Sequence, residues 1–301
     1  MNKKQVKKIA LNIVLILCFA IVAFIGADKV YRSKHVVDTE SRNVQQGLAD
    51  KIEEEVKTEI LAYNVFGSFK EDGSVLINDN RGIPVIAYHS ISDDNIGSPL
   101  VVSTENFREH MKTLKDKGYT TLTMKQVEEY ILNEESIPAK SVLITFDDGY
   151  KDNYTNAFPI LKEFNMNATI FVIPTYLDGQ AYMTPDQVKE MSCYGIDIQS
   201  HTYTHKRLSD LSYEEQFKEL ELSKKQLSEM IGKEVTMCAY PEGRYNDDTL
   251  KAMEKVGYKC AFTIKRGYSD RNDGRFELDR VCVDNTYKSK NILYILKGME
   301  K

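Results

Sequence analysis

The hydrophobic and polar positions of the chain form two different patterns, and the change between them lies close to residue 83. Beyond it, short β-branched apolar runs, typical of buried strands, alternate with stretches whose apolar residues recur at helical spacing. Regular alternation over about 220 residues predicts an α/β fold with parallel strands, either a barrel or an open sheet. The expected strands are 84–89, 120–122, 142–147, 168–173, 196–200, 235–240, 259–264 and 280–283, and the expected helices are 105–117, 124–132, 153–164, 185–193, 213–230 and 247–256.

Three of the expected helices begin with a recognisable start signal. Thr123, Thr184 and Ser212 are each followed three residues later by Gln or Glu, which is the spacing of a capping box. Gly118 and Gly257 have the place and type of helix stops. In a parallel barrel the chemistry sits at the C-terminal ends of the strands, so polar residues at those ends are the first candidates for function.

The amino-terminal part contains one long apolar segment. Residues 9–27 carry no charged side chain, and Lys3, Lys4, Lys7 and Lys8 precede them. A helix of this length can cross a bilayer, and the preceding lysines favour a cytoplasmic amino terminus. We therefore expect a single-pass protein of the cell membrane with the remaining chain extracellular, and a cleaved signal peptide is the alternative. The expected regions are an anchor at 1–27, a stalk at 28–82 and a catalytic domain at 83–301.

Composition narrows the functional classes. The chain has 40 basic and 45 acidic residues and a net charge of −5, and the part after residue 27 is more acidic, at −9. A general nucleic-acid binder needs a basic face, so we expect no nucleic-acid partner. Four cysteines outside the expected anchor permit up to two disulfides in an exported domain, and buried free thiols are the alternative. These residues are Cys193, Cys238, Cys260 and Cys282.

The first candidate site stands at the end of the apolar run 141–146. Asp147, Asp148 and Gly149 follow that run directly. Because side chains alternate along a strand, two adjacent carboxylates point in different directions, so one can bind a metal while the other handles a proton. Gly149 allows the backbone to turn sharply after them. A helix cap or an ordinary turn is the structural alternative for such a triplet.

A second cluster follows the expected strand 196–200. His201 and His205 are two of only five histidines, and a spacing of four places both imidazoles on one side of a helical turn. Two histidines and one carboxylate form a common three-ligand set for catalytic zinc. A surface turn with two polar histidines is the alternative. The carboxylates after residue 146 make a shared site for a divalent metal the better interpretation.

A third cluster, residues 239–246, joins an expected strand to an expected helix. Tyr240, Pro241, Glu242 and Gly243 form its centre. A turn of this kind can direct backbone N–H groups at a developing oxyanion. Taken alone, it is an ordinary strand–loop–helix junction.

Together the three clusters resemble the motifs of the polysaccharide deacetylase family, the NodB-homology group that is also carbohydrate esterase family 4. Residues 145–149 match its first motif residue for residue, residues 201–205 match the second, and residues 240–243 are similar to the third. The resemblance covers roughly residues 83–296. It implies a distorted (β/α) barrel and an enzyme that hydrolyses N-acetyl groups from N-acetylglucosamine units and releases acetate.

The resemblance also implies a role for each motif residue. Asp148, His201 and His205 would bind a divalent metal, most often Zn²⁺, and Asp147 would be the general base. The backbone N–H of Glu242 would help to hold the oxyanion. The expected substrate contacts are Tyr240, Pro241 and Tyr203.

Some positions depart from the family pattern. Met237 stands where the third motif usually has Arg, and no histidine follows His205, although the family has a late catalytic His. His89 resembles an early histidine of the branch that deacetylates poly-β-1,6-N-acetylglucosamine, and it would protonate the departing amine. Arg280 resembles a late arginine of the same branch, and it would orient Asp147.

The expected function is therefore metal-dependent N-deacetylation of an N-acetylglucosamine-containing polysaccharide, with this glycan and the membrane as partners. A peptidoglycan deacetylase is one alternative, which differs in the polymer and not in the chemistry. A non-catalytic glycan-binding protein on the same fold is another. The absent motif residues favour the non-catalytic alternative, and the intact first and second motifs oppose it.

Overall fold

The computed structural model describes residues 75–297, and the fold below concerns the unit that begins at residue 78. The expected anchor at 9–27 and nearly all of the expected stalk lie outside the described residues. Between residues 75 and 297, no helix is long and apolar enough to cross a bilayer. The longest of them, α7 (Tyr213–Ile231), carries charged side chains along its whole length. The expectation of a fold that includes a transmembrane helix, and of a cell-membrane location, is thereby contradicted.

The central sheet contains eight parallel strands, and each of the eight expected strands is present. Their spatial order is β11–β10–β9–β8–β7–β2–β12, and β5 pairs with the start of β7. Phe262 forms a parallel bridge with Leu278, just before β12, so the two ends of the sheet approach each other. The sheet is a distorted (β/α) half-barrel, in agreement with the predicted barrel class. Its strands are β2 (Val85–Tyr88), β5 (Thr120–Thr121), β7 (Ser141–Phe146), β8 (Thr169–Val172), β9 (Asp197–Ser200), β10 (Met237–Ala239), β11 (Cys260–Phe262) and β12 (Val281–Cys282).

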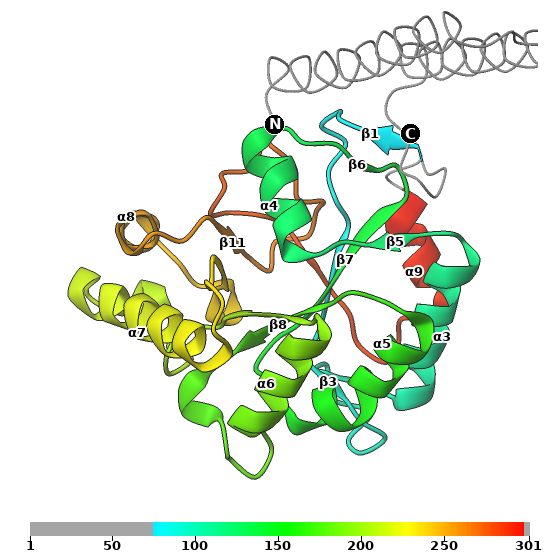
Figure 1. Ribbon diagram of the computed structural model, residues 1–301, viewed down its shortest axis with the longest axis horizontal. Coiled ribbons are helices and arrows are strands. Elements are labelled where there is room, and N and C mark those ends of the chain that lie inside the picture. Colours follow the sequence, from blue (N-terminus) through cyan, green and yellow to red (C-terminus); the bar gives the residue numbers. More distant parts are fainter. Residues whose placement is uncertain (1–74, 298–301) are drawn as a thin grey trace, which may run out of the picture. The chain divides into compact units, whose positions relative to one another are not determined.

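Helices surround the sheet and begin where the start signals predicted. Thr123, Thr184 and Ser212 each form a complete capping box with the residue three positions later. Figure 1 shows α7 and α8 to one side of the sheet and α3, α5 and α9 to the other. The helices besides α7 are α3 (Thr104–Asp116), α4 (Met124–Asn133), α5 (Phe158–Phe164), α6 (Pro185–Tyr194), α8 (Asp247–Val256) and α9 (Ser289–Leu296).

Several short elements were not expected from the hydrophobic pattern. β3 (Ser90–Ile91) pairs with β4 (Val101–Val102) outside the central sheet. A π-helical turn, η1 (Asn153–Ala157), precedes α5, so the helix expected at 153–164 begins with a wider turn. α9 was also not expected. The remaining short elements are β1 (Leu76–Ile77), β6 (Ile137–Pro138), η2 (Pro174–Tyr176), η3 (Leu208–Asp210) and η4 (Pro241–Gly243).

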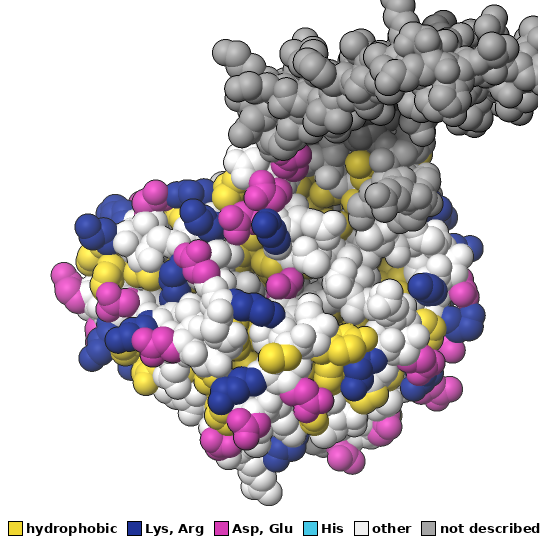
Figure 2. Space-filling model, in the orientation of Figure 1, with side chains coloured by type: hydrophobic (Ala, Val, Ile, Leu, Met, Phe, Trp, Pro, Cys, Tyr) yellow, Lys and Arg dark blue, Asp and Glu magenta, His cyan; other side chains and the backbone are white. Residues whose placement is uncertain are grey.

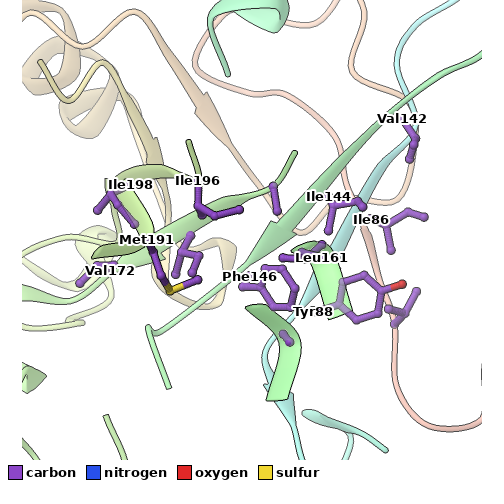
Figure 3. Packing of buried hydrophobic residues seen from close by; sticks show 14 of the residues in the cluster. Ile86, Tyr88, Val142, Ile144, Phe146, Leu161, Val172, Met191, Ile196 and Ile198 are labelled. Atoms are coloured by element: carbon purple, nitrogen blue, oxygen red, sulfur yellow. The ribbon is translucent and has the colours of Figure 1, made fainter. Parts of the chain in front are cut away.

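Strand β7 carries the core on one face and leads into the site on the other. Ile144 and Phe146 pack in the hydrophobic core with Tyr88 of β2 and Leu161 of α5 (Figure 3). The rings of Tyr88 and Phe146 stack with their centroids 5.5 Å apart. Because side chains alternate along a strand, Asp147 points away from this packed face. The buried strand therefore fixes the position from which the first motif starts.

The four described cysteines are free thiols. The register of β10 and β11 places Met237 beside Cys260 and Cys238 beside Ala261. Cys238 and Cys260 therefore lie on opposite faces of the sheet, since neighbouring positions of a strand face opposite ways. The expected alternative of buried free thiols is confirmed for Cys238 and Cys260, whereas Cys193 and Cys282 are free but exposed.

Candidate active site

The chain turns sharply directly after β7. Asp147 continues the strand and is 2% exposed. Asp148 and Gly149 have φ angles of 73° and 77°. Two consecutive residues in the left-handed region redirect the backbone, and Gly149 adopts this conformation without the steric penalty of a Cβ atom. The turn sends the two adjacent carboxylates toward different partners.

Asp147 is paired with a buried arginine. Nη1 and Nη2 of Arg280 donate to Oδ1 and Oδ2 of Asp147 at 2.7 and 2.9 Å, which makes a bidentate ion pair. The Arg280 side chain is completely buried, and its Nε donates to the carbonyl of Thr263 at 2.9 Å. The guanidinium lies over the rings of Phe171 and Phe262. This arrangement fixes the orientation of the Asp147 carboxylate.

The surrounding charges keep Asp147 ionised. Burial raises the pKa of Asp147, but Arg280, His201 and His89 together lower it below its ordinary value. Arg280 approaches from the start of β12, at the end of the sheet next to β2. Met237, which stands where the family motif usually has arginine, is buried in β10. The structure thus brings a guanidinium to Asp147 from a different strand.

Asp148 meets the two histidines of the second motif. Its Oδ1 lies 3.3 Å from Nε2 of His201 and 3.2 Å from Nε2 of His205. His201 is 2% exposed, and its Nδ1–H donates to the carbonyl of Ala239 at 2.8 Å. That hydrogen bond leaves the Nε2 lone pair of His201 free to bind a ligand. The three atoms that could bind a metal all lie within 4.8 Å of one another.

The donor set fits a divalent metal. Oδ1 of Asp148 is buried without a hydrogen-bond partner, although two imidazole nitrogens lie close to it. A buried carboxylate oxygen without a partner is costly unless a ligand binds it. Tetrahedral zinc, with bonds of about 2.0–2.1 Å to nitrogen and oxygen, holds its ligands about 3.3 Å apart. The two separations that involve Asp148, 3.2 Å to His205 and 3.3 Å to His201, match that spacing.

The connection between the two histidines is a loop, so the expected helical turn is wrong. Thr202 and His205 have φ angles of 62° and 61°, which a right-handed helix excludes. This conformation costs an L-residue roughly 1–2 kcal/mol, and it is rare for a β-branched residue. Glu219 of α7 holds the loop by accepting hydrogen bonds from the backbone N–H groups of Tyr203 and Thr204.

His89 follows β2 and faces Asp147 from the neighbouring strand. Its Nε2 lies 3.9 Å from Oδ2 of Asp147, and its side chain is 17% exposed. Burial lowers the pKa of His89 more than the carboxylates of Asp147 and Asp148 raise it, so the pKa lies below its ordinary value. His89 is therefore neutral at neutral pH, and it is placed between the buried carboxylate and solvent.

The third cluster borders the site through its backbone and one ion pair. Tyr240 and Pro241 are buried, so their side chains offer no surface to a substrate. The ring of Tyr240 stacks on that of Tyr245. Glu242 has a φ angle of 51°, and its exposed carboxylate pairs with Arg207, just after the second motif. This ion pair joins the second and third motifs.

Aromatic side chains follow the first motif. Tyr150 stacks on Tyr182 with centroids 5.3 Å apart and planes 14° from parallel. Tyr182 also contacts Tyr176, whose ring lies 6.2 Å from that of His205. Tyr150 lines a cavity of about 740 Å³, whose other lining residues are mostly polar. Tyr203, the third expected substrate contact, is half-buried and holds the loop through its backbone.

Three residues near the site were not predicted from the sequence: Glu219, Tyr176 and Tyr182. Glu219 is one of many charged residues in α7, but it lies on the buried face of that helix. A carboxylate on the buried face of an amphipathic helix is a signal that could have identified it. Tyr176 and Tyr182 meet only through the folding of the segment between β8 and α6, so no sequence signal marks them. The buried residues of α7 are Gln216, Glu219, Leu220, Ser223 and Leu227.

Comparison with known proteins assigns the family. A family model described as polysaccharide deacetylase matches residues 134–261. A Bacillus subtilis protein, YxkH, whose name places it among polysaccharide deacetylases, is 43% identical over 201 residues, covering 67% of this chain and 71% of that protein. The poly-β-1,6-N-acetyl-D-glucosamine N-deacetylase of Staphylococcus epidermidis is 29% identical over 198 residues, covering 61% of this chain and 68% of that enzyme.

A solved structure agrees with this assignment. The deacetylase PplD of Streptococcus pyogenes, in complex with acetate, superposes with a TM-score of 0.69 at 32% identity, covering 72% of this chain and 99% of that chain. The residues that the family model matches, 134–261, include all three motifs. The chain therefore belongs to the polysaccharide deacetylase family, the NodB-homology group of carbohydrate esterase family 4, and is a hydrolase that acts on amide bonds.

Proposed function

We propose that this enzyme removes N-acetyl groups from N-acetylglucosamine units of a polysaccharide in a reaction that depends on a divalent metal. The contrast between two adjacent carboxylates carries the proposal. Asp147 is held ionised by Arg280, whereas Asp148 presents a buried oxygen without a partner to two histidine nitrogens. The first carboxylate is equipped to accept a proton and the second to bind a cation. Hydrolysis of an amide by water benefits from both functions.

The metal-binding residues in this proposal are Asp148, His201 and His205. A divalent ion such as Zn²⁺, when bound by them, would supply activation of water and polarisation of the amide carbonyl. Asp147 accepts a proton from the attacking water. Its bidentate pair with Arg280 keeps Asp147 ionised and fixes both oxygens, so the base is oriented before the substrate binds.

His89 handles the proton of the leaving group in this proposal. Its lowered pKa means that it begins the cycle neutral and takes up a proton during the reaction. Asp147 is the adjacent acid after water attack, with its carboxylate 3.9 Å from Nε2 of His89. Protonation of the nitrogen by His89 then releases the amine. The backbone N–H of Glu242 is the proposed donor to the oxyanion, a role that does not depend on its side chain.

The surroundings of the site suit an uncharged sugar. N-acetylglucosamine polymers offer apolar ring faces and hydroxyl groups, which aromatic and polar side chains recognise. The stack of Tyr150 on Tyr182 and the adjoining cavity, whose lining includes Ser90 and Thr155, provide both kinds of group. Figure 2 shows acidic and basic side chains intermingled on one face of the described region, without segregation by sign. The similarity to the S. epidermidis enzyme makes poly-β-1,6-N-acetylglucosamine the first substrate to test.

The test is acetate release by protein of known zinc content, measured side by side on β-1,6-linked N-acetylglucosamine oligomers and on peptidoglycan fragments. We expect acetate and free amine in equal amounts, loss of both on chelation, and recovery on addition of zinc. Faster turnover of peptidoglycan would reassign the polymer but keep the chemistry. Glycan binding without acetate release by the zinc-loaded protein would instead support the non-catalytic alternative.

A further inference from the structure

A single carboxylate of α7 holds the loop that joins the two histidines. Oε2 of Glu219 accepts the backbone N–H of Tyr203 at 3.0 Å and that of Thr204 at 2.7 Å. Oε1 of Glu219 accepts the hydroxyl of Thr204 at 2.5 Å. Glu219 is only 7% exposed, so solvent does not readily replace these bonds. All three donors lie in the chain between His201 and His205.

The loop requires such an anchor because its backbone is strained. Thr202 and His205, at its two ends, have positive φ angles of 62° and 61°. The carbonyl of Tyr203, within the loop, accepts a hydrogen bond from the hydroxyl of Thr175 at 2.8 Å. The N–H groups of Tyr203 and Thr204 have Glu219 as their acceptor. If the carboxylate is removed, the N–H groups of Tyr203 and Thr204 lose their acceptor, and the loop is free to relax toward ordinary backbone angles.

We propose that Glu219 is a positioning residue for the metal site: it holds the loop in the conformation that brings His205 beside His201 and Asp148. Glu219 is not one of the three ligands, so it acts on metal binding through the loop. The inference deepens the proposed function, on which its catalytic consequence rests. Its consequence for metal affinity rests on the contacts between Glu219 and the loop and on the proposed ligand set, and it does not require catalysis.

The position of Glu219 within α7 argues against a role in the helix itself. It stands in the second turn of a helix of 19 residues, whose capping carboxylate is Glu215. The three hydrogen bonds of the Glu219 carboxylate all cross to the loop, and none joins it to another residue of α7. Loss of this carboxylate therefore disturbs the ligand loop first.

The test compares Glu219→Gln with Glu221→Gln in the full chain. Glu221 lies on the same helix, is exposed, and loses the same charge on substitution. Each protein is stripped with a chelator, and zinc affinity is measured by competition with a fluorescent zinc indicator. Gln keeps one acceptor oxygen but loses the negative charge that strengthens these hydrogen bonds, so we expect Glu219→Gln to raise the zinc dissociation constant about 10-fold, the lower end of the usual effect of disturbing an outer contact of a metal site. Turnover at saturating zinc should recover to within a few-fold of the Glu221→Gln protein.

A second variant keeps the inference testable if Glu219→Gln does not fold. Thr204→Val removes only the hydroxyl bond to Oε1 and keeps both backbone bonds, so we expect a smaller rise in the zinc dissociation constant. In the double variant, the two effects should not add, because they act through one contact. Thermal unfolding of the zinc-free proteins shows whether any effect is confined to the metal-bound state, as the inference requires.

The outcomes separate this inference from the proposed function. Equal zinc affinity in Glu219→Gln and Glu221→Gln, or an unchanged affinity in Thr204→Val where Glu219→Gln cannot be made, would overturn the role of Glu219. If Glu219→Gln lowers the zinc affinity but the wild-type protein releases no acetate from any glycan, Glu219 is supported as a positioning residue and the proposed function is rejected. Acetate release with unaltered zinc affinity in the variants would do the reverse.

Discussion

Asp147 and Asp148 are adjacent in the chain and both buried, yet their surroundings are opposite. Both oxygens of Asp147 receive hydrogen bonds from Arg280, a cation built into the fold. Oδ1 of Asp148 has no hydrogen-bond partner and faces two imidazole nitrogens. The folded protein supplies both oxygens of the first carboxylate with hydrogen bonds, and it leaves one oxygen of the second without a hydrogen-bond partner.

The comparison shows how one short motif can serve two tasks. The backbone turn at Asp148 and Gly149 separates the side chains, so the two carboxylates do not share one proton or one cation. A third buried polar group extends the comparison. His110 of α3 is hydrogen-bonded at both ring nitrogens, to the hydroxyl of Tyr88 and the carbonyl of Tyr287, at 3.1 and 2.9 Å. Such a satisfied group serves structure and requires no ligand.

The largest effect should follow from Asp148→Asn. This change removes the only charged member of the proposed ligand set, so zinc affinity should fall by more than the ~10–100-fold expected for an outer contact. Acetate release should drop to background. Zinc content by mass spectrometry and acetate release check this on the same sample. Asp186→Asn, at an exposed position in the first turn of α6, is the control and should retain both. Full zinc content in Asp148→Asn would contradict the ligand assignment.

Asp147→Asn should separate chemistry from metal binding. The amide cannot accept the water proton, so turnover should fall by about 10²–10⁴-fold. Zinc content should stay at the wild-type level, because Asp147 is not one of the ligands. Acetate release at saturating zinc, together with zinc analysis, tests both halves of this statement. If turnover is unchanged, the base is another residue; if zinc is lost, the two carboxylates are not independent.

Arg280→Met should weaken the fold and the reaction together. Removal of the guanidinium leaves Asp147 buried without a cationic partner, which costs about 3–5 kcal/mol of unfolding free energy. Turnover should fall because the base is no longer fixed, but by less than in Asp147→Asn. Arg280→Lys retains the charge and loses the bidentate geometry, so it should restore part of both quantities. Chemical denaturation and acetate release measure them. Equal turnover in the Met and wild-type proteins would exclude Arg280 from orienting Asp147.

The hydrophobic pattern was sufficient for most of the sheet and helices, because burial sets the spacing of apolar residues. It missed α9, where the sequence Ile-Leu-Tyr-Ile-Leu is too short and too uniformly apolar to show a helical period. It also missed β3 and β4, which are two residues each and depend on one another for pairing. These elements form because the rest of the fold offers them a surface.

Only the site residues that resemble positions of a known family could be predicted from the sequence. Asp148, His201 and His205, which lie close together in the structure, were selected by their resemblance to a family. The pairing of Arg280 with Asp147 spans 133 positions, which no local pattern specifies. The loop between the histidines was assigned the wrong geometry, because a spacing of four also occurs outside helices when two residues take positive φ. Glu219 was overlooked because charge in a helix usually indicates solvent exposure.

The smallest effect on activity should come from His110→Gln, which tests the buried side chain whose two ring nitrogens are both hydrogen-bonded. Burial lowers the pKa of His110 from 6.5 to about 4. Between these values the unfolded chain binds a proton that the folded chain does not. The free energy of unfolding of the wild-type protein should therefore decrease as the pH falls from about 6.5 to about 4. His110 should account for about 2–3 kcal/mol of this decrease. His110→Gln should abolish that part of the pH dependence and keep turnover within about twofold at neutral pH. Chemical denaturation of both proteins at pH 7 and pH 5 measures how much the free energy of unfolding changes with pH. An equal change in the two proteins would show that His110 titrates alike in the folded and unfolded states.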